Sequence, residues 1–105
     1  MIIKYANKKV EKICINHNEA AKELGNKNVA RALAMLMLDL RNVQNFADFY
    51  TKPILKHYRA HELVGDKKGV TSLSINYAYR LTGVVTIQVE EDEILVLEVS
   101  KHYGD

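Results

Sequence analysis

The sequence predicts an α+β fold, in which an N-terminal strand and several helices pack on one face of a small, mostly antiparallel sheet. Apolar residues recur at three- and four-residue steps from Val29 to Val43, as they do along one face of a helix. After Pro53, apolar and polar residues instead alternate in several short segments, as in strands with one buried face. The tight turns between these segments favour an antiparallel meander.

The first part of the chain predicts one strand followed by helices. Residues 1–5 are apolar and β-prone. Asn7 and Asn18 are suited to begin two short helices, because asparagine side chains accept hydrogen bonds from the first free N–H groups of a helix. Either Asn26 or Asn28 begins the long helix.

The apolar side of the long helix is wider than one sheet face requires. Met35, Met37 and Leu38 extend the stripe beyond its core positions. Two explanations remain open. A preceding short helix covers the extra width, or these flexible side chains form a surface for a protein partner.

The second half predicts strands at residues 58–63, 70–75, 81–89 and 95–99, after a short helical turn that Pro53 ends. Alternation leaves a polar face opposite the apolar one. That polar face is predicted to carry Ser72, Ser74, Arg80, Thr82 and Thr86.

Two strands pose questions of side-chain direction. In the last strand, alternation predicts that Leu95, Leu97 and Val99 share the apolar face. In the first strand after Pro53, His61 falls on the same side as Leu63. If Leu63 is part of the core, His61 needs a twist or a bulge to reach the polar face.

Length and composition restrict the class of protein. A chain of 105 residues predicts one domain that spans residues 1–105. Its one cysteine, Cys14, excludes an internal disulfide and a cysteine-based metal site, and is expected to be a small apolar residue in a reduced cytosol. No signal peptide is visible, and the longest apolar run, Ala32–Leu38, is too short to span a bilayer. We therefore expect a soluble cytoplasmic protein.

The net charge is +2, but it is unevenly distributed. Through Ala60 there are eleven Lys and Arg residues against five Asp and Glu, and from His61 onward there are four against eight. A basic half can steer a protein toward nucleic acid, although lysine-rich helix surfaces are common without such a role. The acidic run Glu90–Glu93 is expected to be a solvated hairpin tip.

The stretch His61–Gly69 carries the most specific pattern in the sequence. It reads His-Glu-Leu-Val-Gly-Asp-Lys-Lys-Gly, and an alternating strand and Arg80 follow it. The pattern resembles the HigB branch of the RelE/ParE toxin superfamily, whose members carry a His-x-Leu-x-Gly-Asp-(Arg/Lys)-x-Gly segment. This resemblance implies a RelE-like fold. The matching positions are His61, Leu63, Gly65, Asp66, Lys67, Gly69, Asn76, Arg80 and Leu81.

The resemblance implies catalytic residues for RNA cleavage. Internal attack by a 2′-hydroxyl needs a base, an acid and cations that stabilise the phosphate, and histidine suits the proton steps near neutral pH. His61 is similar to the family's active-site histidine, with pairing at a strand edge as the alternative. Arg80 is similar to the family's strand arginine and is suited to bidentate phosphate binding; otherwise it pairs with Glu98 or another acid.

Further candidates lie in the turn and at the end of the chain. Lys67 and Lys68 are expected to bind RNA, although lysines in a turn are commonly only solvated. Tyr79 can stack on a base or pack in the core, with equal expectation. The resemblance implies catalytic roles for His102 and Tyr103, because the family's last strand often ends in Asp-Tyr-His. Here the order differs, so residue types carry over rather than positions.

By this resemblance the protein would be the toxin of a type II toxin–antitoxin system, an mRNA endoribonuclease that cuts translated messages at the ribosome. It would need no metal and no cofactor. Its partners would be the ribosome, mRNA and a cognate antitoxin, HigA-like with a helix-turn-helix domain, and it would reach operator DNA only through that antitoxin. One alternative is a ParE-like toxin that inhibits DNA gyrase by protein binding. Another is a non-enzymatic RNA- or protein-binding module that uses the basic helices.

Overall fold

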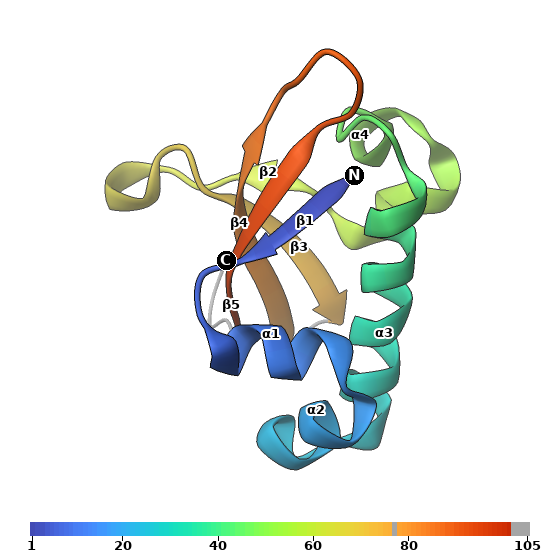
Figure 1. The fold of residues 1–105 in the computed structure, drawn as a ribbon, viewed down its shortest axis with the longest axis vertical. Helices are drawn as coiled ribbons and strands as arrows, with labels where there is room; N and C mark the ends of the chain where they lie inside the picture. The colour runs from blue at the N-terminus through green and yellow to red at the C-terminus, as the bar shows by residue number, and fades with distance from the viewer. Residues whose placement is uncertain (77, 102–105) are drawn as a thin grey trace.

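The computed structural model describes residues 1–76 and 78–101. Its elements are, in order, β1 (Ile2–Tyr5), α1 (Lys8–Ile15), α2 (His17–Leu24), α3 (Lys27–Asn42), α4 (Asp48–Thr51), the 3₁₀ helix η1 (Pro53–Tyr58), β2 (His61–Glu62), the 3₁₀ turn η2 (Gly65–Lys67), β3 (Thr71–Asn76), β4 (Tyr79–Thr86) and β5 (Glu93–Lys101). The strands form one sheet in the order β1-β5-β4-β3-β2 (Figure 1). Only the β1–β5 pair is parallel among these strands. The predicted α+β class is confirmed.

The long helix α3 covers one face of the sheet. It packs against β3 and β1, while α1 packs against α3, β5 and β1 (Figure 1). Leu33, Leu36 and Leu40 of α3 are at most 1% exposed. Their burial at three- and four-residue steps confirms the predicted apolar stripe.

Of the three residues that widen the apolar stripe of α3, one is buried and two are exposed. Met37 belongs to the core and is 0% exposed, whereas Met35 and Leu38 are 53% and 45% exposed. The short helix α2 packs against α3 but leaves these two side chains in solvent. Cover by a short helix is therefore wrong as an explanation for Met35 and Leu38.

Asparagine side chains begin the first three helices. Asn7 Oδ1 accepts a hydrogen bond from Val10 N at 2.9 Å, and Asn26 Oδ1 accepts one from Asn28 N at 2.8 Å. The second helix begins at Asn16, not at Asn18 as the sequence suggested: Asn16 Oδ1 accepts from Glu19 N at 3.1 Å. Asn16 also donates its N–H to Lys12 O, so one residue ends α1 and begins α2. Because α1 and α2 share Asn16, no residues lie between the two helices that would let α2 begin as late as Asn18.

The chain after Pro53 first forms a 3₁₀ helix, so the strand expected at residues 58–63 is confirmed only at His61 and Glu62. Proline at the first helical position has a preset φ and lacks only an N–H that would be unpaired there. Leu55 and Tyr58, three residues apart, are both buried. The Tyr58 hydroxyl donates to Asp39 Oδ2 of α3 at 2.5 Å. Burial raises the pKa of Tyr58, and the hydrogen bond to the Asp39 carboxylate and its charge raise it further.

A β-bulge reverses the faces of β5. Thr82 pairs with Glu98 but Gly83 pairs with Val96, so Leu97 is an extra residue on β5. Ile94 and Val96 are therefore fully buried, and the expectation that Leu95 and Leu97 face the core is wrong. Gly83 permits this close approach, because a Cβ there would lie 2.9 Å from Leu95 O.

The acidic run is not wholly solvated, because Asp92 is only 2% exposed. Its Oδ2 accepts a hydrogen bond from Phe46 N at 2.8 Å and its Oδ1 accepts one from Gln88 N at 3.1 Å. Its backbone N–H donates to Gln44 O at 2.9 Å. Asp92 thus connects the β4–β5 hairpin to the segment that follows α3.

Among the helices of residues 1–76 and 78–101, none has the length and apolar character that a membrane span requires.

Replacing Asp92 by Ala should lower the free energy of unfolding by about 2–4 kcal/mol, because the buried N–H of Phe46 loses its acceptor. Chemical denaturation monitored by circular dichroism measures this difference. Glu90→Ala is the matched control in the same hairpin; Glu90 is exposed and offers Gln44 only its backbone carbonyl, so we expect a change within about 0.5 kcal/mol. Equal effects of the two substitutions would contradict the role of Asp92.

The Cys14 thiol is buried, and burial raises its pKa to about 12. A group whose pKa is raised on folding contributes stability below its unfolded pKa and loses it as the pH rises toward the folded value. Between about pH 8.5 and pH 11, the unfolding free energy of the wild type should therefore fall faster than that of Cys14→Ala, by at most about 1.4 kcal/mol per pH unit. Denaturation at several pH values measures both slopes, and parallel slopes would contradict the prediction.

Candidate functional site

The open face of the sheet carries a continuous row of polar residues across four strands. His61 pairs with Ser72, Ser72 with Thr82, and Thr82 with Glu98. Directly opposed residues in antiparallel strands point to the same face. Leu73 and Leu81, which alternate with this row, are buried under the helices. His61 therefore lies on the open face.

The position of His61 answers the question of side-chain direction without a bulge in β2. The strand comprises only His61 and Glu62, and Leu63 is half-buried rather than a core residue. Leu63 contributes its backbone N–H to Val70 O at 2.8 Å. The expected conflict between His61 and a core Leu63 does not arise.

Arg80 lies on the same face, one row further along. It pairs with Ser74 on one side and with Ser100 on the other. Strand spacing places the Cα atoms of His61 and Arg80 about 12 Å apart. Between them, Ser72 and Thr82 are only 2% and 3% exposed, so small side chains form the floor of the face.

The ring of His61 is oriented by a backbone carbonyl. His61 Nδ1 lies 2.9 Å from Arg59 O. A carbonyl oxygen only accepts, so Nδ1 carries a hydrogen in this contact. In the neutral ring Nε2 then keeps its lone pair and can take a proton. The arrangement suits a general base.

Arg59 has an unusual backbone conformation. At φ 52° and ψ 46° it is left-handed, and it is the only non-glycine residue with a positive φ in the part of the chain that the structure describes. For an L-residue this conformation costs about 1 kcal/mol. The strained residue is the one whose carbonyl contacts His61.

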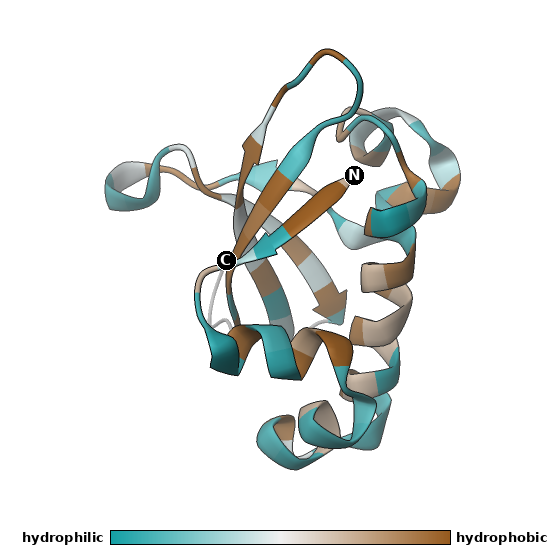
Figure 2. Cartoon of the chain, viewed as in Figure 1, coloured by the Kyte–Doolittle hydropathy of each residue, from teal (hydrophilic) through white to brown (hydrophobic). Residues whose placement is uncertain are grey.

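Lys67 and Lys68 lie on an exposed turn beyond β2. Gly65 and Gly69 have φ values of 72° and 90°, and Lys68 N donates to Gly65 O at 3.1 Å. The turn, yellow in Figure 1, extends beyond the edge of the sheet, and Figure 2 shows that it is largely hydrophilic. The two lysines are thus held on the side of the sheet next to His61 rather than between His61 and Arg80.

Tyr79 lies on the helix-covered side, so of the two places expected for it, packing against the core is the one found. Its ring packs against the core, and its hydroxyl donates to Leu24 O at the end of α2 at 3.1 Å. The Lys101 ammonium lies 5.8 Å from its ring centre. The hydrogen bond and the core contacts together keep Tyr79 away from a ligand on the open face.

His102 and Tyr103, predicted to act in catalysis, lie outside the described residues. Within residues 1–76 and 78–101, no three His, Cys, Asp or Glu side chains are grouped to hold a metal ion. Alternation in the last strand predicts Glu98 on the face opposite Leu97 and Val99, and the register places it in the row of His61. Nothing in the sequence indicated the conformation of Arg59.

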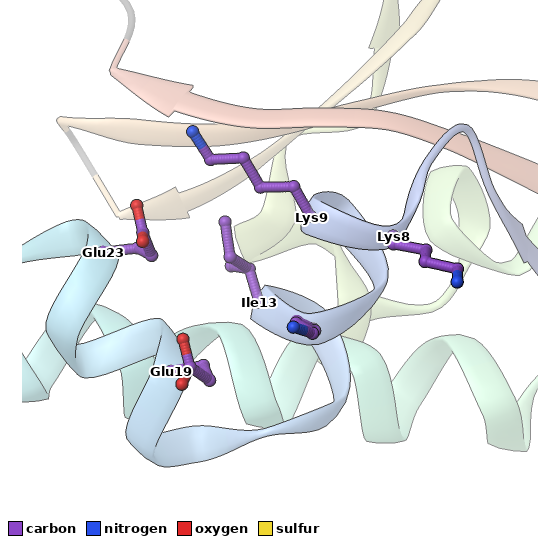
Figure 3. Close-up of a pocket in the computed structure, with 6 residues that line it drawn as sticks. Lys8, Lys9, Ile13, Glu19 and Glu23 are labelled. Atoms are coloured by element: carbon purple, nitrogen blue, oxygen red, sulfur yellow. The ribbon is translucent and has the colours of Figure 1, made fainter.

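The basic helix surface forms a separate feature on the helical side. A hollow of about 270 Å³ lies between α1 and α2. Figure 3 shows Ile13 between Lys9 of α1 and the carboxylates of Glu19 and Glu23 of α2. Because acidic and basic side chains share this hollow, it does not present the uniform positive charge that a polyanion requires.

Comparison with known proteins identifies the fold. No family model matches the chain, and no curated protein matches it in sequence. Among solved structures, the YoeB/ParE toxin from Agrobacterium tumefaciens aligns with a TM-score of 0.61 and 18% identity over 98% of this chain and 100% of that chain. YafQ from E. coli strain BL21(DE3) gives a TM-score of 0.62 and 18% identity over 94% of this chain and 90% of that chain.

A third structure, HP0894 from Helicobacter pylori, gives a TM-score of 0.51 and 19% identity over 97% of this chain and 94% of that chain. The chain therefore has the fold of RelE/ParE-type toxins. The fold that the resemblance implies is confirmed, and these matches do not single out the HigB branch.

Replacing Tyr79 by Phe removes the hydrogen bond to Leu24 O and should lower the free energy of unfolding by about 1 kcal/mol. The change should leave any RNA affinity of the open face unaltered, because the hydroxyl lies on the other side of the sheet. Thermal denaturation and fluorescence anisotropy with a labelled RNA measure the two quantities. Tyr50→Phe, at an exposed tyrosine, is the control for hydroxyl removal. Weaker RNA binding without a change in stability would contradict the placement of Tyr79.

Proposed function

We propose that this protein is the toxin of a type II toxin–antitoxin pair and that it is an mRNA endoribonuclease acting on translated messages at the ribosome. One observation carries the proposal: His61 and Arg80 share a polar sheet face, with the His61 ring held so that Nε2 is the proton-accepting nitrogen. The fold shared with the YoeB/ParE toxin supports the class of protein.

The proposed reaction uses the substrate's own 2′-hydroxyl as nucleophile. His61 Nε2 takes the 2′-hydroxyl proton while the 2′-oxygen forms a bond to phosphorus. The bond from phosphorus to the 5′-oxygen breaks, and a second group donates a proton to that oxygen, leaving a cyclic phosphate and a 5′-hydroxyl. Arg80 stabilises the charge on the phosphate oxygens. We assign the second proton transfer to His102 or Tyr103. We assign contacts with neighbouring phosphates of the RNA to Lys67 and Lys68.

The same proposal covers partners. A cognate antitoxin, HigA-like with a helix-turn-helix domain, would neutralise the protein and link it to operator DNA. Met35 and Leu38, the exposed pair on α3, offer an apolar surface suited to a protein partner. The reaction needs no metal and no cofactor.

Gyrase inhibition is the second candidate, since the A. tumefaciens neighbour is named as a YoeB/ParE toxin. A gyrase inhibitor acts by protein binding and needs no proton-transfer residue. The arrangement of His61 and Arg80 on one face favours the nuclease. A non-enzymatic module that uses the basic helices is less favoured, because Glu19 and Glu23 share the lysine-lined hollow.

Growth and mRNA cleavage after induction test the proposal. His61→Ala and Arg80→Ala should each lower the cleavage rate by about 10²–10⁴-fold and remove growth arrest, because each removes a group that acts on the reacting phosphate. A truncation that lacks residues 102–105 should have a similar effect. Arg80→Lys should retain more activity than Arg80→Ala, since one positive charge remains.

His57→Ala is the matched histidine control. His57 is exposed and its Nδ1 lies 2.9 Å from Ile54 O, a contact like that of His61, but it belongs to η1 and not to the sheet face. We expect it to keep full toxicity. A toxic wild type with intact mRNA would favour gyrase inhibition. Loss of function on replacing Lys8, Lys9 and Lys12 by Ala, but not on His61→Ala, would favour the binding module.

A further inference from the structure

We infer that Glu98 is a specificity-determining residue of the open face, and that it selects guanine as a base beside the phosphate that is cleaved. Glu98 pairs with Thr82 of β4, and the row to which this pair belongs ends at His61 on β2. The inference rests on the proposed function, in which the open face binds RNA. It adds base recognition, which His61 and Arg80 do not supply because contacts with phosphate carry no sequence information.

Glu98 lies on the same floor as the two residues assigned to the reaction. In the β4–β5 pair it is diagonal to Arg80, so their Cα atoms lie about 8 Å apart. Three strand spacings place its Cα atom about 14 Å from that of His61. Between His61 and Glu98 the row consists of Ser72 and Thr82, whose small side chains are 2% and 3% exposed. The two longer side chains therefore lie at opposite ends of a row of small ones.

The carboxylate of Glu98 is available to a ligand. The side chain is exposed, and no residue within 1–76 and 78–101 forms a hydrogen bond or an ion pair with its carboxylate. Glu93, another glutamate of β5, instead pairs with Lys4 at 3.1 Å. An unpaired negative charge repels the phosphates of RNA. On a face that binds RNA, such a charge is favourable only if it accepts hydrogen bonds from a base.

Apolar side chains lie beside Glu98 on the same face. Val84 follows Thr82 by two residues, is 37% exposed and pairs with Leu95. Leu95 and Leu97 are half-buried, and neither is among the described side chains that pack against the core. A base bound at Glu98 would cover this apolar surface with its ring, and the two rings of a purine cover more of it than the single ring of a pyrimidine.

The chemistry of a carboxylate selects guanine among the bases. A carboxylate accepts hydrogen bonds and cannot donate them. The Watson–Crick edge of guanine presents adjacent donors, N1–H and the N2 amino group, which match the two carboxylate oxygens. Adenine, cytosine and uracil each place an acceptor beside their donor, and that acceptor would face a carboxylate oxygen. Glu98 therefore favours guanine over the other bases.

Substitution of Glu98 can change this preference without a change of shape. Glu98→Gln presents one acceptor and one donor, which match the edges of adenine and cytosine. Glu98→Ala removes both groups. Glu93→Gln is the matched control, because it removes a negative charge from the same strand at a carboxylate that pairs with Lys4. Backbone amide spectra establish that each variant is folded.

Cleavage is measured after induction of the full chain, on translated reporter messages that differ in one base beside the mapped cut. The wild type and Glu93→Gln should cleave the guanine message about tenfold faster or more than the other messages. Glu98→Gln should instead prefer adenine or cytosine by a similar factor. Glu98→Ala should cleave all four within about threefold of one another, because no bidentate pair remains. Both variants of Glu98 should still arrest growth, unlike His61→Ala.

A titration of the full chain with guanosine 3′-monophosphate or adenosine 3′-monophosphate separates the inference from the proposed function. The ¹⁵N chemical shifts of the backbone amides around Glu98 report binding. The wild type should bind the guanosine nucleotide about fivefold tighter or more, and Glu98→Gln should reverse the order. If the wild type cleaves no RNA, the proposed function fails while the titration still decides whether Glu98 selects guanine.

Three results would overturn the inference. An unchanged base preference in Glu98→Gln would exclude base recognition by the carboxylate. Faster cleavage of all four messages at unchanged preference would assign to Glu98 only repulsion of RNA. Loss of all cleavage in folded Glu98→Gln would place Glu98 in the reaction itself rather than in the choice of base.

Discussion

The burial of one sheet face under α3 is the constraint on which the rest of the structure depends. Leu73, Leu81, Ile94 and Val96 are each 0% exposed on that face. Moving one such side chain into water costs about 2 kcal/mol, and a one-residue slip of a strand would expose all of its core residues together. The register is therefore strongly determined. The polar residues that alternate with this core, Arg80 among them, have no other side to occupy.

Irregularities in the backbone then decide which residues join the open face. Without the extra residue Leu97 in β5, the alternation that buries Ile94 and Val96 would direct Glu98 into the core. A buried, unpaired carboxylate costs several kcal/mol, so the bulge resolves a conflict within the sequence of this strand. It also returns Val99 to the helix side, where it packs against the core. Glu98 shares the row of His61 as a result.

Periodic features of the fold could be predicted from the sequence. A helix buries residues at three- and four-residue steps and a strand buries every second residue, so the apolar pattern shows which element forms. The stripe of α3 and the alternation in β3 and β4 are of this kind, and they correctly placed Arg80 on the open face. A cap at Asn16 rather than Asn18 depends on the abutment of two helices, which no local pattern shows. Tyr79 was ambiguous because a tyrosine suits either face, and its bond to Leu24 is a contact between residues far apart in sequence.

The candidate site was predictable in residue type but not in geometry. The His-x-Leu-x-Gly-Asp pattern indicated His61, yet its direction depends on how short β2 is, and its tautomer depends on Arg59. A left-handed arginine has no sequence signal, since the positions that favour this conformation usually carry glycine or asparagine. Three-dimensional anchoring by Tyr58 on one side and by β3 on the other produces it.

The distribution of charge bears on how such a site would meet RNA. The sequence placed its excess of positive charge in the helical half, and in the structure α1 with its lysines packs on the covered side of the sheet, away from His61. Electrostatic affinity for nucleic acid grows with the number of phosphates that cations neutralise. Arg80 with the exposed Lys67 and Lys68 can neutralise few phosphates, and Glu98 opposes them on the same face. Under the proposed function, this face would hold free RNA only weakly. Its charges therefore favour a substrate that a larger assembly such as the ribosome presents over RNA captured from solution.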